Sequence, residues 1–273
     1  MYTANAEGQR KPVTIASLVE MKQRGQKISC LTVYDYSFTV ALDQAGVDVM
    51  LVGDSLGMVM QGRETTLPVT MEEIIYHCRC VASARPAGLL MADMPFMSHG
   101  TVADALHNAG RLMKEGGARI VKLEGTGEQA EVVTQLAGAG IPVCAHLGLR
   151  PQAVHKVGGY RVQGRDESSA RAMVEDARVL EHAGADMLLL ECVPVALAAE
   201  IARGTQLPVI GIGAGPDCDG QILVLQDMLG LTPGKIPRFA KNFMPEGGSI
   251  HGALQAYVKA VADGTFPASE HCF

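Results

Sequence analysis

Four carboxylates follow short apolar runs that have the composition of buried strands. The runs and their acids are Val47–Val52 before Gly53 and Asp54, Gly88–Ala92 before Asp93, Ile120–Leu123 before Glu124, and Met187–Leu190 before Glu191. A buried strand has no structural need for an acid at its end, because an unpaired buried anion costs several kcal/mol or more. If the strands are parallel, all four acids emerge at one edge of the sheet, which indicates a metal site or an acid/base site.

The first three acids are candidates for a metal centre. Neighbouring strands lie ~4.8 Å apart, so Asp54, Asp93 and Glu124 can converge if they end successive strands. Oxygen donors suit Mg²⁺ better than zinc, which prefers His and Cys ligands. These three residues are therefore predicted to hold Mg²⁺.

Glu191 and Lys122 are candidates for contact with a substrate. If the strands close into a barrel, Glu191 would lie across its open end from the other three acids. Its neighbours in sequence are apolar, and an apolar setting raises a carboxyl pKa toward the range that a general base needs. Lys122 is two residues before Glu124, so both side chains point to the same face of a strand. Lys122 either receives a substrate carboxylate or forms a buried Lys–Glu pair that serves charge balance, and the sequence favours neither.

The histidines are weaker candidates for site residues than the acids and Lys122. His146 ends the fifth strand candidate and could donate a hydrogen bond at the site, although a lone His at a strand end is more often structural. The other histidines show no ligand spacing and are predicted at the surface or on helices: His77, His99, His107, His155, His182, His251 and His271.

Strands that alternate with helices must position these side chains. The strand candidates are Ile28–Val33, Val47–Gly53, Gly88–Ala92, Arg119–Glu124, Val143–His146, Met187–Glu191, Val209–Gly213 and Gln221–Leu225. Helical patterns cover Glu72–Ala82, Ala103–Glu115 and Ala170–Ala183, with an opening helix after Thr14 and a closing one over Gly252–Val261. Eight such units predict an α/β fold, a (β/α)8 TIM barrel, in one domain over residues 1–273 with a helix before the first strand.

An open doubly wound sheet is the alternative fold. Its support is the glycine-rich stretch Gly211–Pro216, which lacks the third glycine of the dinucleotide fingerprint. In a barrel, this turn serves either ligand approach or close packing. The long segments Leu56–Met71 and Gly148–Glu167 are predicted to be loops over the active face, as lids or cosubstrate walls.

Composition excludes several classes of function. The formal net charge is −6, Trp is absent and aromatic residues make up 4% of the chain, so neither nucleic acid nor an anionic membrane is an expected partner. Seven scattered cysteines indicate a reducing, cytoplasmic location without a disulfide framework. No signal peptide and no membrane span is expected.

A series of motifs resembles the ketopantoate hydroxymethyltransferase family from about Pro12 onward. They are Thr32–Ser37 (TVYDYS), Leu51–Met58 (LVGDSLGM), Thr66–Thr70 (TLPVT), Val121–Gly125 (VKLEG), His146–Leu149 (HLGL), Gly158–Tyr160 (GGY), Leu190–Pro194 (LECVP), Gly211–Gly215 (GIGAG) and Phe239–Phe243 (FAKNF). Each motif alone is only suggestive, but this many in one order is specific.

The resemblance implies a barrel of the phosphoenolpyruvate-mutase/isocitrate-lyase type in a homo-oligomer, typically a decamer. It implies Mg²⁺-dependent transfer of a hydroxymethyl group from 5,10-methylenetetrahydrofolate to 3-methyl-2-oxobutanoate, giving 2-dehydropantoate in pantothenate biosynthesis. By motif, Asp54, Asp93 and Glu124 match the metal ligands. Asp54, Ser55, Asp93 and Lys122 match the keto-acid contacts, and Glu191 matches the proton acceptor.

The chain departs from the family pattern at three positions. Arg150 stands where Thr is usual, His99 where Tyr is common and Cys272 where Ser is frequent. Two other functions stay open at this point. One is a C–C lyase or P–C mutase reaction on the same barrel, and the other is a non-catalytic scaffold that only binds a metal.

Overall fold

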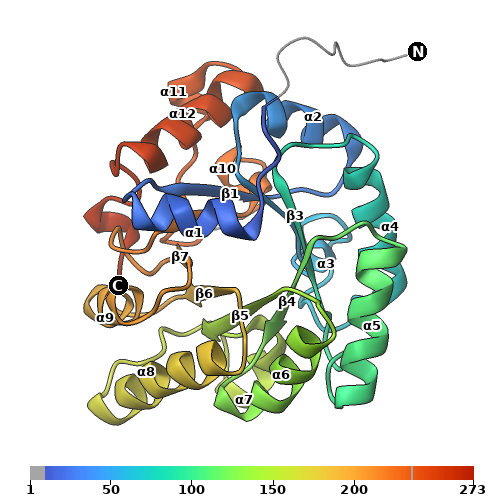
Figure 1. Cartoon of the computed structure of the whole chain (residues 1–273). Helices are drawn as coiled ribbons and strands as arrows, with labels where there is room; N and C mark the ends of the chain where they lie inside the picture. The colour runs from blue at the N-terminus through green and yellow to red at the C-terminus, as the bar shows by residue number, and fades with distance from the viewer. Residues whose placement is uncertain (1–9, 235) are drawn as a thin grey trace.

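The computed structural model describes residues 10–234 and 236–273 and shows a closed barrel of eight parallel strands in sequence order (Figure 1). The strands are β1 (Ile28–Thr32), β2 (Val49–Val52), β3 (Leu89–Asp93), β4 (Ile120–Glu124), β5 (Val143–Gly148), β6 (Met187–Glu191), β7 (Val209–Ile212) and β8 (Gly220–Leu223). Because β8 pairs with β1, the barrel prediction is confirmed and the open-sheet alternative is wrong.

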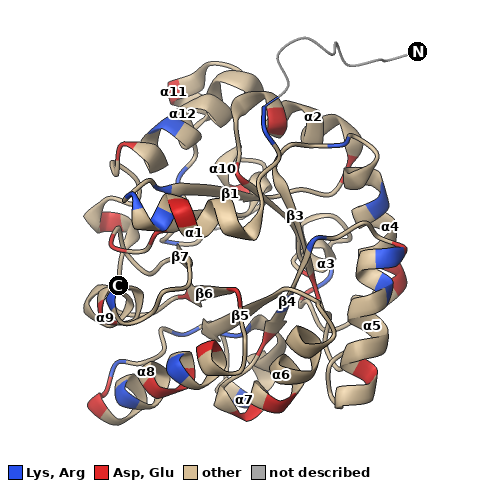
Figure 2. Ribbon diagram, in the orientation of Figure 1, with Lys and Arg blue, Asp and Glu red and all other residues tan. Residues whose placement is uncertain are grey.

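Helices surround the barrel (Figure 1). They are α1 (Ile15–Gln23), α2 (Tyr36–Ala45), α3 (Leu56–Val59), α4 (Met71–Ala82), α5 (Val102–Lys114), α6 (Ala130–Gly138), α7 (Val154–Val157), α8 (Glu167–His182), α9 (Val195–Gly204), α10 (Leu225–Met228), α11 (Met244–Gly247) and α12 (Ile250–Ala262), with short 3₁₀ turns η1 (Gly127–Gln129), η2 (Pro151–Ala153) and η3 (Ser269–His271). Figure 2 shows that α4 and α8 carry residues of both charge signs. None of the helices in the described part of the chain is long and apolar enough to cross a bilayer.

The strands form because their residues are apolar on both faces. Every residue of β1 to β4 is buried, as expected when helices cover the outside of a parallel sheet and side chains fill the inside. Strand β2 begins at Val49, two residues later than predicted. The reason is the end of α2, where Gly46 takes a left-handed conformation (φ +89°) and the N–H of Val47 bonds to the carbonyl of Leu42.

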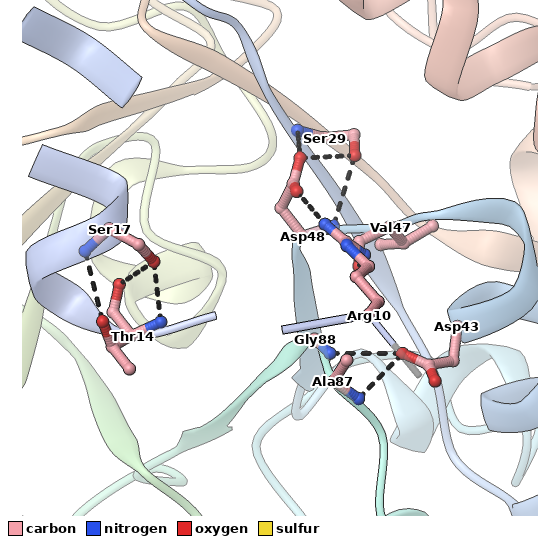
Figure 3. A network of polar contacts seen from close by, with 9 residues as sticks. All are labelled: Arg10, Thr14, Ser17, Ser29, Asp43, Val47, Asp48, Ala87 and Gly88. Carbon is pink, nitrogen blue, oxygen red and sulfur yellow. Dashed lines mark hydrogen bonds and ion pairs between the residues drawn. The ribbon is translucent and has the colours of Figure 1, made fainter. Parts of the chain in front are cut away.

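The N-terminal edge of the barrel is closed by structural polar contacts (Figure 3). Asp48 accepts hydrogen bonds of 2.9 Å from both the N–H and the hydroxyl of Ser29 and pairs with Arg10. Asp43 accepts a 2.9 Å bond from the N–H of Ala87. These acids lie opposite the edge where the chemistry is expected, as their positions in a helix and at a strand start predict.

The glycine-rich turn after β7 packs closely against neighbouring segments. A Cβ added at Gly213 (φ +60°) would lie 2.9 Å from the ring of Phe273, and one at Gly215 would lie 2.9 Å from the side chain of Val195. Close packing therefore accounts for these glycines, and a ligand-binding role is not needed to explain them.

Candidate active site

The predicted acids gather at the C-terminal edge of the barrel. Asp93, Glu124 and Glu191 are the last residues of β3, β4 and β6, and Asp54 follows β2 after Gly53. Asp54, Asp93 and Glu124 are buried, whereas the side chain of Glu191 keeps 15% of its surface exposed. Catalytic residues of TIM-barrel enzymes occupy this edge, and Glu191 has the exposure that a residue in contact with substrate needs.

Asp93 connects two of the other site residues. Its Oδ2 accepts a 2.8 Å hydrogen bond from the N–H of Asp54, and its Oδ1 lies 2.7 Å from the Nζ of Lys122. The second contact follows from the register, which places Asp93 beside Lys122. Burial alone would lower the pKa of Lys122, but Asp93, Glu124 and Asp54 raise it above its usual value, so the ammonium stays charged. Lys122 thus pairs with Asp93 on the neighbouring strand rather than with Glu124.

Gln152 joins two of the acids from the loop between β5 and α8. Its backbone N–H donates to Glu124 Oε2 at 3.0 Å. Its side-chain amide donates to Asp54 Oδ2 at 2.8 Å and to the carbonyl of Met94 at 3.0 Å. The sequence predicted this loop as a wall of the site but gave no signal for Gln152, since a single Gln in a loop has no characteristic spacing.

His146 lies between Lys122 and Glu191. Its Nδ1 is 3.2 Å from Lys122 Nζ and its Nε2 is 3.4 Å from Glu191 Oε2. Burial, followed by the charge of Lys122, holds the pKa of His146 well below its usual value, so the ring is neutral. Because an ammonium can only donate, we assign the ring proton to Nε2, where it faces Glu191. His146 therefore lies at the site.

Two of the carboxyl groups titrate near neutrality. Burial, followed by the charge of Asp93, raises the pKa of Asp54 to about 7. Burial also raises the pKa of Glu191 to about 7, with Lys122 opposing and Asp93 adding to the shift. The value for Glu191 agrees with the raised pKa that its apolar sequence context predicts, and it suits a general base.

Ser55 is held by a residue that the sequence did not single out. Its hydroxyl shares a 2.8 Å hydrogen bond with the buried Tyr34, which follows β1. The Nδ1 of His77 on α4 lies 2.8 Å from the carbonyl of Tyr34. Ser55 therefore has a fixed position at the start of α3, beside the acids.

The prediction that His99 lies at the surface or on a helix is wrong. Its side chain is 7% exposed, and its Nε2 lies 3.2 Å from the carbonyl of Glu124. The loop after β3 folds across the end of β4, which buries the ring, and this burial lowers the pKa of His99.

The turn after Glu191 is fixed by its neighbours. The carbonyl of Glu191 accepts a 2.8 Å bond from the N–H of Leu149, and the N–H of Cys192 donates to the carbonyl of Ile212. Cys192 has a left-handed backbone (φ +49°), which is uncommon for a residue with a side chain. A Cβ at Gly148 would lie 2.3 Å from the carbonyl oxygen of Glu191, so only glycine fits there. This packing holds the backbone of the candidate base in one place.

The donor set at this edge fits a hard divalent cation. Asp54, Asp93 and Glu124 offer only oxygen atoms, and Glu124 Oε1 is buried without a hydrogen-bond partner. Burial and the charges of Asp54 and Asp93 raise the pKa of Glu124 well above its usual value, and a bound cation would relieve this repulsion. However, no group of three or more His, Cys, Asp or Glu within residues 10–234 and 236–273 is already arranged to hold an ion. Side-chain rotation would be needed, and the metal role of the three acids stays a prediction.

Comparison with known proteins identifies the family. Residues 12–269 match the family described as ketopantoate hydroxymethyltransferase. The chain belongs to this family. A relative from Alkalilimnicola ehrlichii, described as 3-methyl-2-oxobutanoate hydroxymethyltransferase, is 67% identical over 273 residues and covers 100% of this chain and 99% of its own length. Membership of the ketopantoate hydroxymethyltransferase family makes this chain an enzyme of the transferase class, so the non-catalytic scaffold is wrong.

Solved structures show that the fold is shared more widely than the family. Phosphonopyruvate hydrolase in complex with oxalate and Mg²⁺ is 14% identical, with a TM-score of 0.60 over 95% of this chain and 93% of the hydrolase. A 2,3-dimethylmalate lyase of the PEP mutase/isocitrate lyase superfamily is 17% identical, with a TM-score of 0.51 over 72% of this chain and 70% of the lyase. At these identities the likeness concerns the fold alone, and it confirms the predicted barrel type.

Proposed function

We propose that this enzyme transfers a hydroxymethyl group from 5,10-methylenetetrahydrofolate to 3-methyl-2-oxobutanoate and releases 2-dehydropantoate, a step of pantothenate biosynthesis. The observation that carries the proposal is the family match over residues 12–269, joined to one barrel edge that carries Glu191, the three acids and the Lys122–Asp93 pair. A homo-oligomer and a cytoplasmic location remain predictions from the resemblance and the composition.

Asp54, Asp93 and Glu124 would hold Mg²⁺, which suits their oxygen donors. When bound, the ion would polarise the keto oxygen of the substrate and stabilise the negative charge that develops there. The phosphonopyruvate hydrolase of the same fold was solved with Mg²⁺ and oxalate, which supports a divalent cation and a small carboxylate as ligands of such a barrel.

Lys122 and Ser55 would bind the carboxylate of the keto acid. The raised pKa of Lys122 keeps it cationic, and Ser55 is oriented by its hydrogen bond to Tyr34. With this end fixed, C3 of the substrate would face Glu191, whose partly exposed carboxylate takes the proton. The carbon that loses the proton then attacks the methylene carbon of the folate as one of its two C–N bonds breaks, and the released nitrogen takes up a proton. Water then replaces the second nitrogen on that carbon: it supplies the hydroxyl group of the product and a proton to the nitrogen, which releases tetrahydrofolate.

His146 would support Glu191 during this proton transfer. Its neutral ring faces Glu191 through Nε2 at 3.4 Å without a hydrogen bond in this structure, and a closer approach would let it donate to the carboxylate while the base is ionised. Lys122 holds the other ring nitrogen and so fixes this tautomer. The base is thereby oriented by a neighbouring strand, as general bases in other enzymes are.

Proton NMR tests the proposal in two steps. With 3-methyl-2-oxobutanoate in deuterated water, enzyme and Mg²⁺ should cause loss of the C3 methine signal. Adding 5,10-methylenetetrahydrofolate should then convert the substrate to 2-dehydropantoate. Cleavage of a C–C bond in a hydroxy acid, without any hydroxymethyl transfer, would favour the lyase alternative and contradict the proposal.

The pH dependence of kcat/KM should show an acidic limb near pH 7. Since burial raises the pKa of Glu191 to about 7, protonation below that pH removes the base, and kcat/KM should fall about tenfold per pH unit. The carboxyl is half ionised at a pH equal to its pKa, so the limb levels off about one pH unit higher, where roughly nine-tenths of it is ionised. Initial rates with saturating Mg²⁺ and folate would measure the profile, and a flat profile between about pH 5 and 8 would contradict the assignment.

A further inference from the structure

The loop between β5 and α8 is attached to the barrel at two places. Near its start, Gln152 bonds to the acid cluster through its backbone N–H, which donates to Glu124, and its side-chain amide, which donates to Asp54 and also to the carbonyl of Met94. Near its end, the N–H of Gln163 donates to the carbonyl of Cys192 at 2.9 Å, beside the candidate base. The loop is therefore held at one end by two of the site acids and at the other by the residue that follows Glu191.

The middle of the loop is much less constrained. Gly158 and Gly159 have left-handed φ values of +71° and +115°, and a Cβ at either would meet no atom within 4 Å. Tyr160 is 51% exposed and reaches the barrel mouth through a 3.6 Å contact between its hydroxyl and Met58 Sδ. The two attachment points thus decide where this middle part lies.

The hydrogen bonds of Gln152 differ from ordinary loop contacts because two of them are made to proposed metal ligands. It is 9% exposed, and it binds Asp54 and Glu124, which come from different strands. Without a cation, the carboxylates repel one another and their orientations are not fixed by a shared ligand. A cation that binds both would fix them, and the groups that donate hydrogen bonds to metal ligands orient those ligands in turn.

We propose that Gln152 is a positioning residue that couples the loop over Gly148–Glu167 to the acid cluster, so that a divalent cation in the cluster orders the loop over the mouth. The proposal rests on the proposed function, because it takes Asp54 and Glu124 as cation ligands. Coupling between two binding events is reciprocal. A loop docked through Gln152 therefore also strengthens the binding of the cation, and the cation prepares the wall against which the second substrate binds.

Two measurements that need no turnover test this coupling on the full-length enzyme. Calorimetric titration with MgCl₂ gives the affinity for the ion, and hydrogen–deuterium exchange of peptides from the loop, with and without Mg²⁺, gives its order. In the unmodified enzyme, Mg²⁺ should slow exchange in the loop by about 5-fold or more. In Gln152→Met, which keeps the volume and the backbone N–H but lacks the amide, this slowing should disappear. The affinity for Mg²⁺ should also fall by about 10-fold or more.

Gln163→Met is the matched control. Among residues 10–234 and 236–273, its side-chain amide donates only to the carbonyl of Arg161 within the loop, so both the affinity and the Mg²⁺-dependent slowing should stay as in the unmodified enzyme. Gln152→Asn, which keeps an amide but shortens its reach, should change in the same direction as Gln152→Met and serves if the latter does not fold.

The outcomes separate this inference from the proposed function. If Mg²⁺ binds the unmodified enzyme but leaves loop exchange unchanged, or if both Gln152 variants keep the slowing and the affinity, the coupling is wrong and the proposed function stands. If Mg²⁺ does not bind at all, the cation in the proposed function is wrong and the coupling fails with it.

Discussion

Glu191→Gln is expected to lower the rate of deuterium exchange at C3 of 3-methyl-2-oxobutanoate by about 10²–10⁴-fold, the usual contribution of a general base. Gln has nearly the same shape as Glu, but its amide cannot take up a proton. The keto acid should still bind, because Lys122, Ser55 and the three acids are unchanged. The expected result is therefore a loss in kcat with the dissociation constant of the keto acid within a few-fold of its original value. NMR exchange rates and calorimetric binding measure the two quantities.

The exposed Glu200→Gln on α9 is a matched control, since it makes the same chemical change far from any contact with the site residues. It should leave the exchange rate unaltered. Near-normal exchange in Glu191→Gln would remove Glu191 from the role of base.

The fold could be predicted from sequence because the strands are mostly apolar runs, and several of them follow a small-residue break or end at an acid. The strands that carry Asp93, Glu124 and Glu191 were predicted to end at or within one residue of their observed ends. Parallel strands place their ends at one edge, so the gathering of the acids followed from the topology without knowledge of any contact.

The residues that orient the acids could not be predicted in the same way. Gln152 reaches Asp54 across 98 positions of sequence, and Tyr34 reaches Ser55 from the loop after β1. Neither belongs to a periodic pattern, because a loop residue's direction depends on how the loop packs in three dimensions. His99 shows the same limit, since its burial results from a loop that crosses a neighbouring strand.

Lys122→Met is expected to lower the free energy of unfolding of the metal-free enzyme by about 3–5 kcal/mol near pH 8, the usual effect of removing one partner of a buried ion pair. Lys122 is 4% exposed and lies 2.7 Å from Asp93. Met fills nearly the same space, so the loss comes from charge rather than from a cavity. Denaturant unfolding in the presence of a chelator measures the change. The exposed Lys114→Met on α5 is the control, with an expected change of at most about 1 kcal/mol.

The pH dependence of this loss distinguishes charge from packing. The folded pKa of Lys122 is raised, so its contribution is fully present below its unfolded pKa of about 10.4 and does not itself vary between about pH 5 and 8. The contribution of the buried carboxyl groups to stability, in contrast, does vary with pH in this range. Lys122 lowers the pKa of Asp54, which burial nevertheless raises to about 7, and without Lys122 that pKa rises further. The folded variant then binds more protons than its unfolded chain, and its stability falls more steeply than that of the unmodified enzyme as pH rises from about 5 to 8.

Mg²⁺ should restore part of the lost stability at pH 8, because it supplies positive charge to the acids that Lys122 no longer balances. The gain in unfolding free energy on adding Mg²⁺ is therefore expected to be larger in Lys122→Met than in the unmodified enzyme, even though the variant lacks the group that would bind the substrate carboxylate. A loss of stability that is independent of pH and unaffected by Mg²⁺ would mean that Lys122 acts through packing. In that case repulsion within the acid cluster would not be the cause of the lost stability. The case for a cation among Asp54, Asp93 and Glu124 would then rest on the family resemblance and their donor atoms alone.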